Sequence, residues 1–370
     1  MPEAGKRIGL ALSGGGFRAT LFGLGTLWRL NEAGLLGNLT RITSVSGGSI
    51  LAGILAHRWR QLNFSDGLAD NFEAVLAKPV RDFCSQSIDI KTAILGHITP
   101  FKTSGDFLAK RYAKDLFGKT LLRDLPNPKY EKAPCFIFYA TNLQTGRSFR
   151  FRQDYIADYY LGVSHSTDVQ LAEAVAASSA FPPVFSPVII ESDPLAWQNP
   201  LKNLPNLDRL RQRIVLADGG VYDNMGMEAL IDNVDVILVS DAGAPFEIDE
   251  SPHEDDLLQL GRVRDILIDQ TRALRKRWLV TEFEAGRWQG GYWGIGTKID
   301  AYHDPNALVT DNDITAALED IPTRLKSFAL REQGRLINWG YALADAALRM
   351  RAGFALAPAQ GWPIPEWALD

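Results

Sequence analysis

Residues 8–18, IGLALSGGGFR, and residues 41–49, RITSVSGGS, decide the fold class of this chain. Each stretch begins as a short apolar run that is typical of a buried strand, and each then breaks at glycines. Apolar residues with helical spacing follow both breaks, over residues 19–36 and 49–58. A strand, a glycine turn and a helix in repetition indicate an α/β fold with a parallel sheet and crossover helices.

Strand and helix patterns continue along the rest of the chain. Strands are predicted at residues 135–141, 147–152, 214–217, 234–240 and 292–302. Helices are predicted at residues 171–178 and 255–281 and, with breaks near Pro322 and Gly340, at 314–351, whereas residues 191–212 resemble an exposed loop. We expect a catalytic core over residues 1–250 and a helical region over residues 251–370, packed on the core or continuous with it.

The composition narrows the classes of function and location that fit this chain. The 370 residues are 46% apolar and carry a formal net charge of -5, which argues against a nucleic-acid polymer as partner. Cys84 and Cys135 are far apart, so we expect neither a disulfide framework nor a zinc site, and a cytoplasmic location fits best. The polar first seven residues do not resemble a secretory signal, and no apolar run is long enough to span a membrane.

The turn Ser44-Val45-Ser46-Gly47-Gly48 has the form of a nucleophile elbow. A serine at a sharp strand-to-helix turn presents its hydroxyl at the edge of the sheet, and small neighbours accommodate the strained backbone. Ser44 stands where the first glycine of this motif normally lies. Taken alone, Ser46 is more readily explained as a helix N-cap, because serine is strongly preferred there.

Two further turns bear on whether Ser46 is a nucleophile or an N-cap. Gly14-Gly15-Gly16 can direct backbone N–H groups at a phosphate or an oxyanion, and Arg18 then orients the loop, attracts a lipid phosphate or is an ordinary surface arginine. Asp218-Gly219-Gly220 follows an apolar strand, so Asp218 is a candidate base for Ser46, with Asp241 as a rival at another strand end and Asp223 as a lesser one. The histidines have no strand-end glycine motif, and we expect structural or solvated roles for His57, His97, His165, His253 and His303.

Several motifs, in order along the chain, resemble the patatin-like phospholipases, here of a bacterial type. They are GGGFR at 14–18, SVSGGS at 44–49, ASSAFPPVF at 177–185, ADGGVYDN at 217–224 and YWGIGT at 292–297. The resemblance implies a three-layer fold with a central, mostly parallel sheet flanked by helices, and a helical C-terminal region. It also implies a Ser46–Asp218 dyad, an oxyanion turn formed by Gly14, Gly15, Gly16 and Arg18, and hydrolysis of phospholipid or lysophospholipid esters without metal or cofactor.

Such an enzyme is expected to associate peripherally with the inner face of the membrane. Two alternatives remain: a phospholipase effector of antiviral defence that a cyclic dinucleotide activates by assembly into a homo-oligomer, and a non-catalytic lipid-binding protein with the same fold. Arg272, Arg275, Lys276 and Arg277, beside Trp278, either contact anionic head groups or form a solvated helix face.

Overall fold

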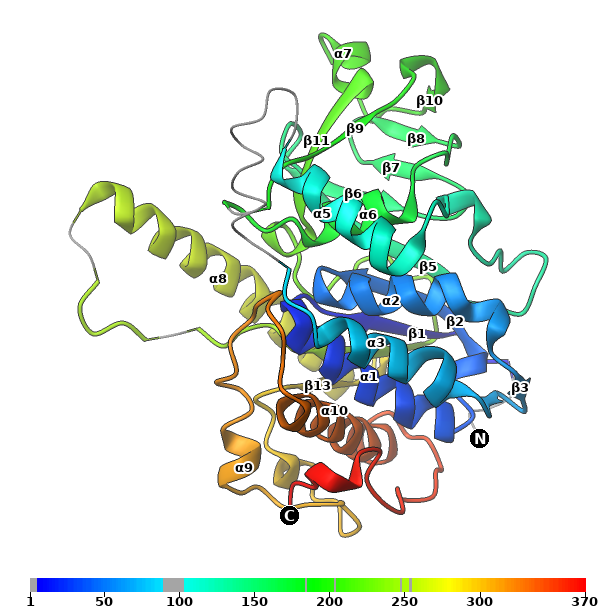
Figure 1. Ribbon diagram of the computed structural model, residues 1–370, viewed down its shortest axis with the longest axis vertical. Helices are drawn as coiled ribbons and strands as arrows, with labels where there is room; N and C mark the ends of the chain where they lie inside the picture. The colour runs from blue at the N-terminus through cyan, green and yellow to red at the C-terminus, as the bar shows by residue number, and fades with distance from the viewer. Residues whose placement is uncertain (1–4, 89–102, 184, 203, 247, 253–254) are drawn as a thin grey trace.

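The computed structural model describes residues 5–88, 103–183, 185–202, 204–246, 248–252 and 255–370. Its main sheet follows the order β10-β8-β7-β6-β5-β2-β1-β12-β13, and β11 and β9 join at β5 (Figure 1). The strands are β1 (Ile8–Leu12), β2 (Leu39–Val45), β5 (Cys135–Asn142), β6 (Arg147–Phe151), β7 (Ile156–Asp158), β8 (Gly162–Ser164), β9 (Val188–Glu191), β10 (Trp197–Gln198), β11 (Arg213–Asp218), β12 (Val236–Asp241) and β13 (Gln289–Gly294). A separate hairpin pairs β3 (Phe64–Ser65) with β4 (Leu68–Ala69).

Helices cover this sheet. They are α1 (Gly16–Glu32), α2 (Gly47–Arg58), α3 (Lys78–Cys84), α5 (Ser104–Tyr112), α6 (Leu171–Ser179), α7 (Leu207–Gln212), α8 (Asp256–Glu284), α9 (Asp313–Ala316) and α10 (Leu330–Met350). Among the described helices, none is both long and apolar enough to cross a bilayer.

Strand β1 is buried on both faces, as expected for a strand inside a parallel sheet. Leu10 and its alternate neighbours belong to the large core that includes α1, α2 and α10. Ala11 faces the other way, into a cluster with Met225, Val239 of β12 and Leu279 of α8. The molecule therefore has helix, sheet and helix layers, and the expected three-layer α/β class is confirmed. The parallel part is β5-β2-β1-β12-β13, and the strands beyond β5 run antiparallel.

Helix α10 packs against α1 along its length, and it runs unbroken through Gly340. The predicted break there is wrong, because this glycine serves close packing. A Cβ atom at Gly340 would lie 2.0 Å from a carbonyl oxygen of α1, and one at Gly25 would lie 1.9 Å from a carbonyl oxygen of α10. A buried ion-pair network also joins the helices: Asp345 contacts Arg29 at 2.7 Å and Arg349 at 2.8 Å.

Two other predictions differ from the structure. Residues 191–212 are not a plain loop, because they contain β10 and α7. The strand predicted over residues 292–302 is β13, which begins at Gln289 and ends at Gly294, and Ile299–Tyr302 is a short 3-10 helix. In both cases short elements are fixed by pairing and burial against distant segments, which local patterns do not encode.

Candidate active site

Ser46 occupies the sharp turn between β2 and α2. Its backbone is left-handed, with φ 51°, although it is not a glycine, and such strain is typical of functional turns. Its neighbours have to be glycines here: a Cβ atom at Gly47 would lie 1.9 Å from the Gly16 carbonyl oxygen, and one at Gly48 would lie 2.4 Å from that of Leu12. The side chain of Ser46 accepts no N–H bond from α2, so it does not act as an N-cap.

Hydrogen bonds to α6 also hold the turn at Ser46 in place. The Ser46 N–H donates to the carbonyl oxygen and the hydroxyl of Ser178, at 3.1 and 3.0 Å. Ser44, in place of the motif's usual glycine, is fully buried, and its hydroxyl accepts a hydrogen bond from Ser49 at 2.9 Å. Serine therefore fits at position 44 because buried hydroxyls there satisfy one another.

Sheet register brings Asp218 to Ser46. Val45 at the end of β2 pairs with Tyr139 of β5, and Asp218 at the end of β11 pairs with the next residue, Ala140. Strand β6 occupies the opposite edge of β5 at this point, so β2 and β11 lie end to end along one edge. Because β11 runs antiparallel to β5, the two strands end facing each other. Asp218 therefore lies at the end of an antiparallel strand, beside the carboxyl end of β2.

The Asp218 carboxyl group is buried, with 2% exposure, and has few partners. It accepts the Gly220 N–H at 2.7 Å, and the Ser46 side chain lies beside it. Burial raises the pKa of Asp218 from 3.8 to about 7, although the interactions with Ser46 and with the Gly220 N–H act in the opposite direction. A carboxylate with this pKa is a competent proton acceptor near neutral pH.

The two rival aspartates are already engaged. Asp241 accepts from Arg272 at 3.0 Å, from the Tyr292 hydroxyl at 2.9 Å and from the Gly243 N–H at 2.9 Å. Although burial acts to raise it, these partners bring the pKa of Asp241 below its ordinary value. Asp223 is paired with the guanidinium of Arg275 at 3.2 Å. Neither is among the residues that line the pocket around Ser46.

The Gly14-Gly15-Gly16 turn lies against the elbow. Gly14 donates its N–H to the Asn224 carbonyl oxygen at 3.0 Å. The N–H groups of Gly15 and Gly16 have no acceptor in the described part of the chain, and both residues line the pocket. Their positive φ angles, 143° and 56°, require glycine. Of the three glycines, Gly15 and Gly16 have free donors beside Ser46, and Gly14 does not.

Arg18 is buried, with 1% exposure, and does not line the pocket. Its guanidinium donates to three carbonyl oxygens, those of Ala242 at 2.9 Å, Glu319 at 3.0 Å and Ile321. Burial lowers the pKa of Arg18 to about 10, so it stays charged at neutral pH. The surface-arginine interpretation is wrong, and Arg18 instead fixes the glycine turn to distant backbone.

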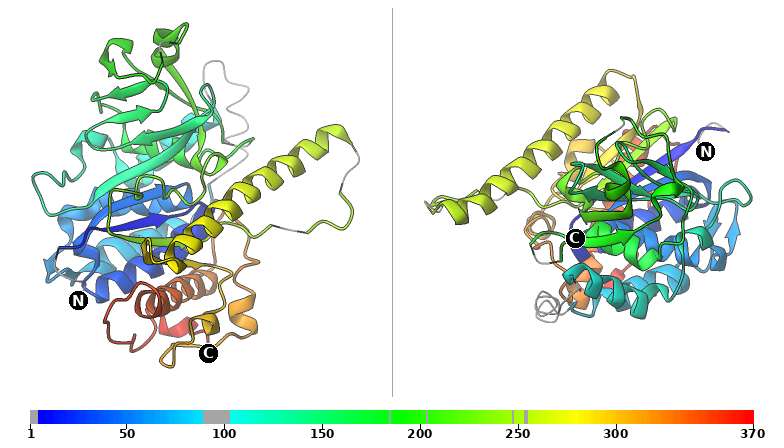
Figure 2. Two further views of the ribbon diagram at one scale, coloured as in Figure 1. Left: turned by 180° about the vertical axis from the view of Figure 1, so that it is seen from behind. Right: turned by 90° about the horizontal axis from the view of Figure 1, so that it is seen from above.

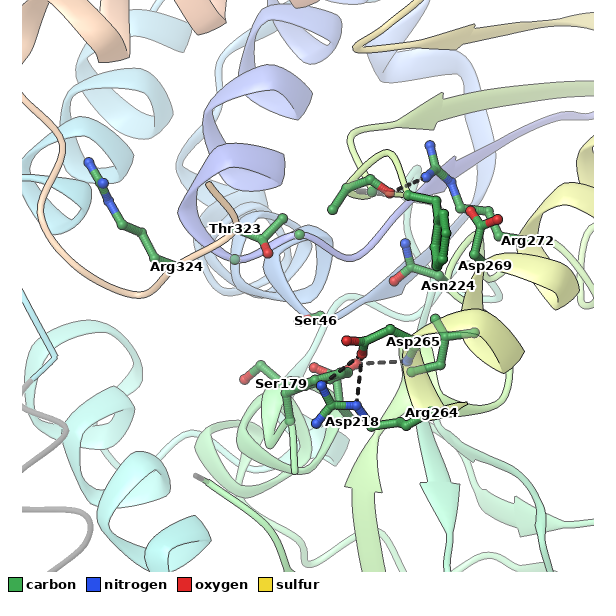
Figure 3. A pocket seen from close by; sticks show the side chains of 18 of the residues that line it. Ser46, Ser179, Asp218, Asn224, Arg264, Asp265, Asp269, Arg272, Thr323 and Arg324 are labelled. Atoms are coloured by element: carbon green, nitrogen blue, oxygen red, sulfur yellow. Dashed lines mark hydrogen bonds and ion pairs between the residues drawn. The ribbon is translucent and has the colours of Figure 1, made fainter. Parts of the chain in front are cut away.

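Ser46 and Asp218 lie in a cavity of about 550 Å³. Figure 3 shows its polar wall on α8 facing Thr323 and Arg324 across the site. That wall consists of Arg262, Arg264, Asp265, Asp269 and Arg272, and the apolar lining of Phe181, Phe185, Phe246, Ile268 and Leu325. Sequence reasoning named Arg272 only as part of a basic segment and missed the other residues, together with Ser179 and Asn224, because they carry no motif of their own. Four of the missed residues nevertheless fall inside the quoted blocks: Ser179, Phe181, Phe185 and Asn224.

The basic segment of α8 is not a uniform solvated face. Arg272 and Arg275 are partly buried and form ion pairs with Asp241 and with Asp223 and Glu228. They anchor the helix, so the interpretation of a wholly solvated face is wrong. The histidines are elsewhere: His57, His165 and His303 do not line the pocket, and His97 and His253 lie outside the described residues.

One comparison with known proteins shows the family, and another shows the fold. The model for the patatin-like phospholipases matches residues 10–231, whereas no curated protein matches the chain. Human GIVD cytosolic phospholipase A2, solved with methyl gamma-linolenyl fluorophosphonate, matches at TM-score 0.51 and 13% identity, over 94% of this chain and 58% of that one. VipD from Legionella pneumophila matches at TM-score 0.40 and 16% identity, over 94% of this chain and 67% of that one. The chain thus spans somewhat over half the length of the human enzyme, and at this identity the likeness shows the fold alone.

Proposed function

The chain belongs to the patatin-like phospholipase family, and on this premise we propose that it is a serine acyl hydrolase that cleaves ester-linked fatty acids of phospholipids or lysophospholipids. One observation carries the proposal: Ser46, on a strained turn, and the buried Asp218 carboxyl group line the same cavity, and the Ser46 side chain acts on the pKa of Asp218. A hydroxyl group placed beside a potential base is the arrangement that covalent catalysis by a serine requires.

The reaction we propose has two halves. Ser46 Oγ attacks the ester carbonyl carbon while its proton passes to Asp218, and the tetrahedral oxyanion accepts hydrogen bonds from the Gly15 and Gly16 N–H groups. The C–O bond to the alcohol then breaks, and the leaving oxygen takes the proton from Asp218. Water attacks the acyl-enzyme in the same way and releases the fatty acid. Each oxyanion donor is expected to contribute on the order of 10²- to 10³-fold in turnover.

Neighbouring groups support this assignment of roles. Arg18 does not touch the reacting groups but holds the glycine turn in place through its hydrogen bond to the Ala242 carbonyl oxygen. Gly14, in the same turn, is held by the hydrogen bond that its N–H donates to the Asn224 carbonyl oxygen. The phenylalanines and Ile268 offer apolar contact to an acyl chain, and the arginines of α8 offer charge to a phosphate. We propose a peripheral encounter with the inner face of the membrane, where such substrates reside.

A fluorophosphonate probe tests the nucleophile. Wild type and Ser179→Ala should be labelled, because the Ser179 hydroxyl also lines the pocket but donates to the Val175 carbonyl oxygen at 2.7 Å. Ser46→Ala should not be labelled. Persistent labelling of Ser46→Ala, or none of the wild type, would refute the proposal. Asp218→Asn should abolish release of fatty acid, and adding cyclic dinucleotides to that assay tests the regulated-effector alternative.

A further inference from the structure

Helix α8 carries an apolar stripe on its outer face. Figures 1 and 2 show the helix starting away from the body of the molecule and running back toward the sheet. Six apolar side chains along it are 42% to 63% exposed: Leu260, Val263, Ile266, Leu267, Leu274 and Trp278. At 3.6 residues per turn these positions fall within about 120° of one another. We call these six residues the outer stripe.

The opposite face of α8 is fixed to the body by charged groups. Arg264 donates to the Pro182 carbonyl oxygen at 3.2 Å, Arg272 pairs with Asp241 at 3.0 Å, and Arg275 pairs with Asp223 at 3.2 Å. Rotating the helix to bury the stripe would break these contacts and leave Asp241 without its cation. The stripe therefore faces outward because the ion pairs determine which face of α8 faces inward, and exposed apolar patches of this kind mark interaction sites.

We propose that the outer stripe is a docking surface for a phospholipid bilayer, which delivers the substrate of the proposed hydrolase to the cavity beside it. The stripe and the cavity lie on two sides of the same helix, since Arg264, Ile268 and Arg272 on the inner face of α8 line the cavity. A lipid leaving a bilayer in contact with α8 would have to cross only the width of the helix to reach Ser46.

Charge and side-chain type favour a bilayer over another occupant. The remaining residues of this face over positions 259–281 are Gln259, Gln270, Thr271, Arg277 and Thr281. None of these is acidic, although Glu284 at the end of the helix falls on the same side, so anionic head groups meet no repulsion along the stripe itself. Trp278, whose ring packs at 4.9 Å against Trp288, lies beside Arg277, and this pairing of an aromatic with a basic residue is typical of the membrane interface.

Vesicle binding tests the surface directly. The full chain with Ser46→Ala, which leaves lipids intact, is sedimented with phosphatidylcholine vesicles with and without phosphatidylglycerol. Leu267→Glu/Leu274→Glu should weaken binding by about tenfold or more, because two leucines leave the interface and two charges enter it. The control Leu195→Glu/Leu330→Glu makes the same change at leucines that are 90% and 60% exposed elsewhere, and should bind as its parent does.

A second measurement reports the site of contact. Leu267→Cys can be labelled with an environment-sensitive fluorophore, because both native cysteines are buried. Its emission should shift to the blue on adding vesicles, and the same label at position 195 should not respond. No vesicle binding by the parent, equal binding by both double variants, or a dimer that Leu267→Glu/Leu274→Glu dissociates without loss of vesicle binding would overturn the proposal.

The proposed docking surface and the proposed hydrolase activity can be tested separately. With Ser46 intact, hydrolysis of a short-chain soluble ester should be the same in Leu267→Glu/Leu274→Glu and in wild type. If the ester is hydrolysed but vesicle binding ignores the stripe, the docking surface is wrong and the hydrolase stands. If vesicle binding depends on the stripe but no ester is hydrolysed, the docking surface stands and the hydrolase proposal is wrong.

Discussion

Replacing Asp218 by asparagine should make the protein more stable at high pH while removing its activity. Burial holds the pKa of folded Asp218 at about 7, against 3.8 for the ordinary group. Between these values the folded state keeps a proton that the unfolded state has lost. Folding stability therefore falls as pH rises from about 4 to about 7, and stays low above that.

The size of the effect follows from the shift. About three pKa units correspond to about 4 kcal/mol of destabilisation at pH values above both pKa values. Between pH 5 and pH 8 alone, the change is about 2.5 kcal/mol. The amide that replaces the carboxyl group cannot ionise, so the free energy of unfolding of Asp218→Asn minus that of wild type should rise by this amount from pH 5 to pH 8.

Denaturant unfolding at several pH values measures this difference, and Asp241 supplies the matched control. Asp241 pairs with Arg272 at 3.0 Å, and its pKa is lowered, so its charged form stabilises the folded state. Asp241→Asn should therefore be less stable than wild type from pH 5 to pH 8, whereas Asp218→Asn should be more stable than wild type at the upper end of this range. A stability difference for Asp218→Asn that is the same at pH 5 and pH 8 would show that folded Asp218 is not perturbed, and would remove the basis for its role as base.

Three further outcomes are expected. With a soluble ester, log kcat/KM should rise with pH to a plateau above about pH 7, as Asp218 loses its proton, and a flat profile from pH 5 to pH 8 would exclude this base. Asp345→Ala leaves buried Arg29 without its carboxylate and removes one of the two carboxylates that pair with Arg349, so it should lower the free energy of unfolding by about 3–5 kcal/mol, measured in denaturant. Gly340→Ala, whose Cβ atom would lie 2.0 Å from the Phe22 carbonyl oxygen, should lower the free energy of unfolding by about 1–3 kcal/mol. Gly261→Ala, in an open stretch of α8, should raise the free energy of unfolding by about 0.5–1 kcal/mol. Equal effects of the two variants would contradict the packing argument.

The sequence predicted the elements around the elbow well because glycine turns mark them. Ser46 could be located from a strand, two glycines and an apolar helix, all within about fifteen residues. The same pattern could not separate nucleophile from N-cap, because that distinction depends on whether the Ser46 side chain accepts a bond from α2, and the turn is held by bonds that the Ser46 N–H donates to Ser178, far along the chain. Resemblance to a family supplied what local chemistry did not.

The choice between Asp218 and Asp241 shows why the rest was out of reach. Both aspartates end an apolar strand before small residues, and both are buried. They differ in their partners: Arg272 of α8 neutralises Asp241, and no cation pairs with Asp218 among the described residues. Which side chain meets which strand end depends on how helices far along the chain pack, and no local pattern reports that.

The Gly14-Gly15-Gly16 turn depends on residues beyond the matched family region, which ends at residue 231. The Phe17 N–H donates to the Arg324 carbonyl oxygen at 2.9 Å, and Arg18 donates to the carbonyl oxygens of Glu319 and Ile321. Strand β13 extends the sheet, and α10 covers α1, the helix that begins at this turn. Residues on both sides of position 250 thus contribute to one sheet and to the support of this turn. The geometry of Gly15 and Gly16, on which oxyanion stabilisation is proposed to depend, is then set as much by the C-terminal segment as by the motif itself.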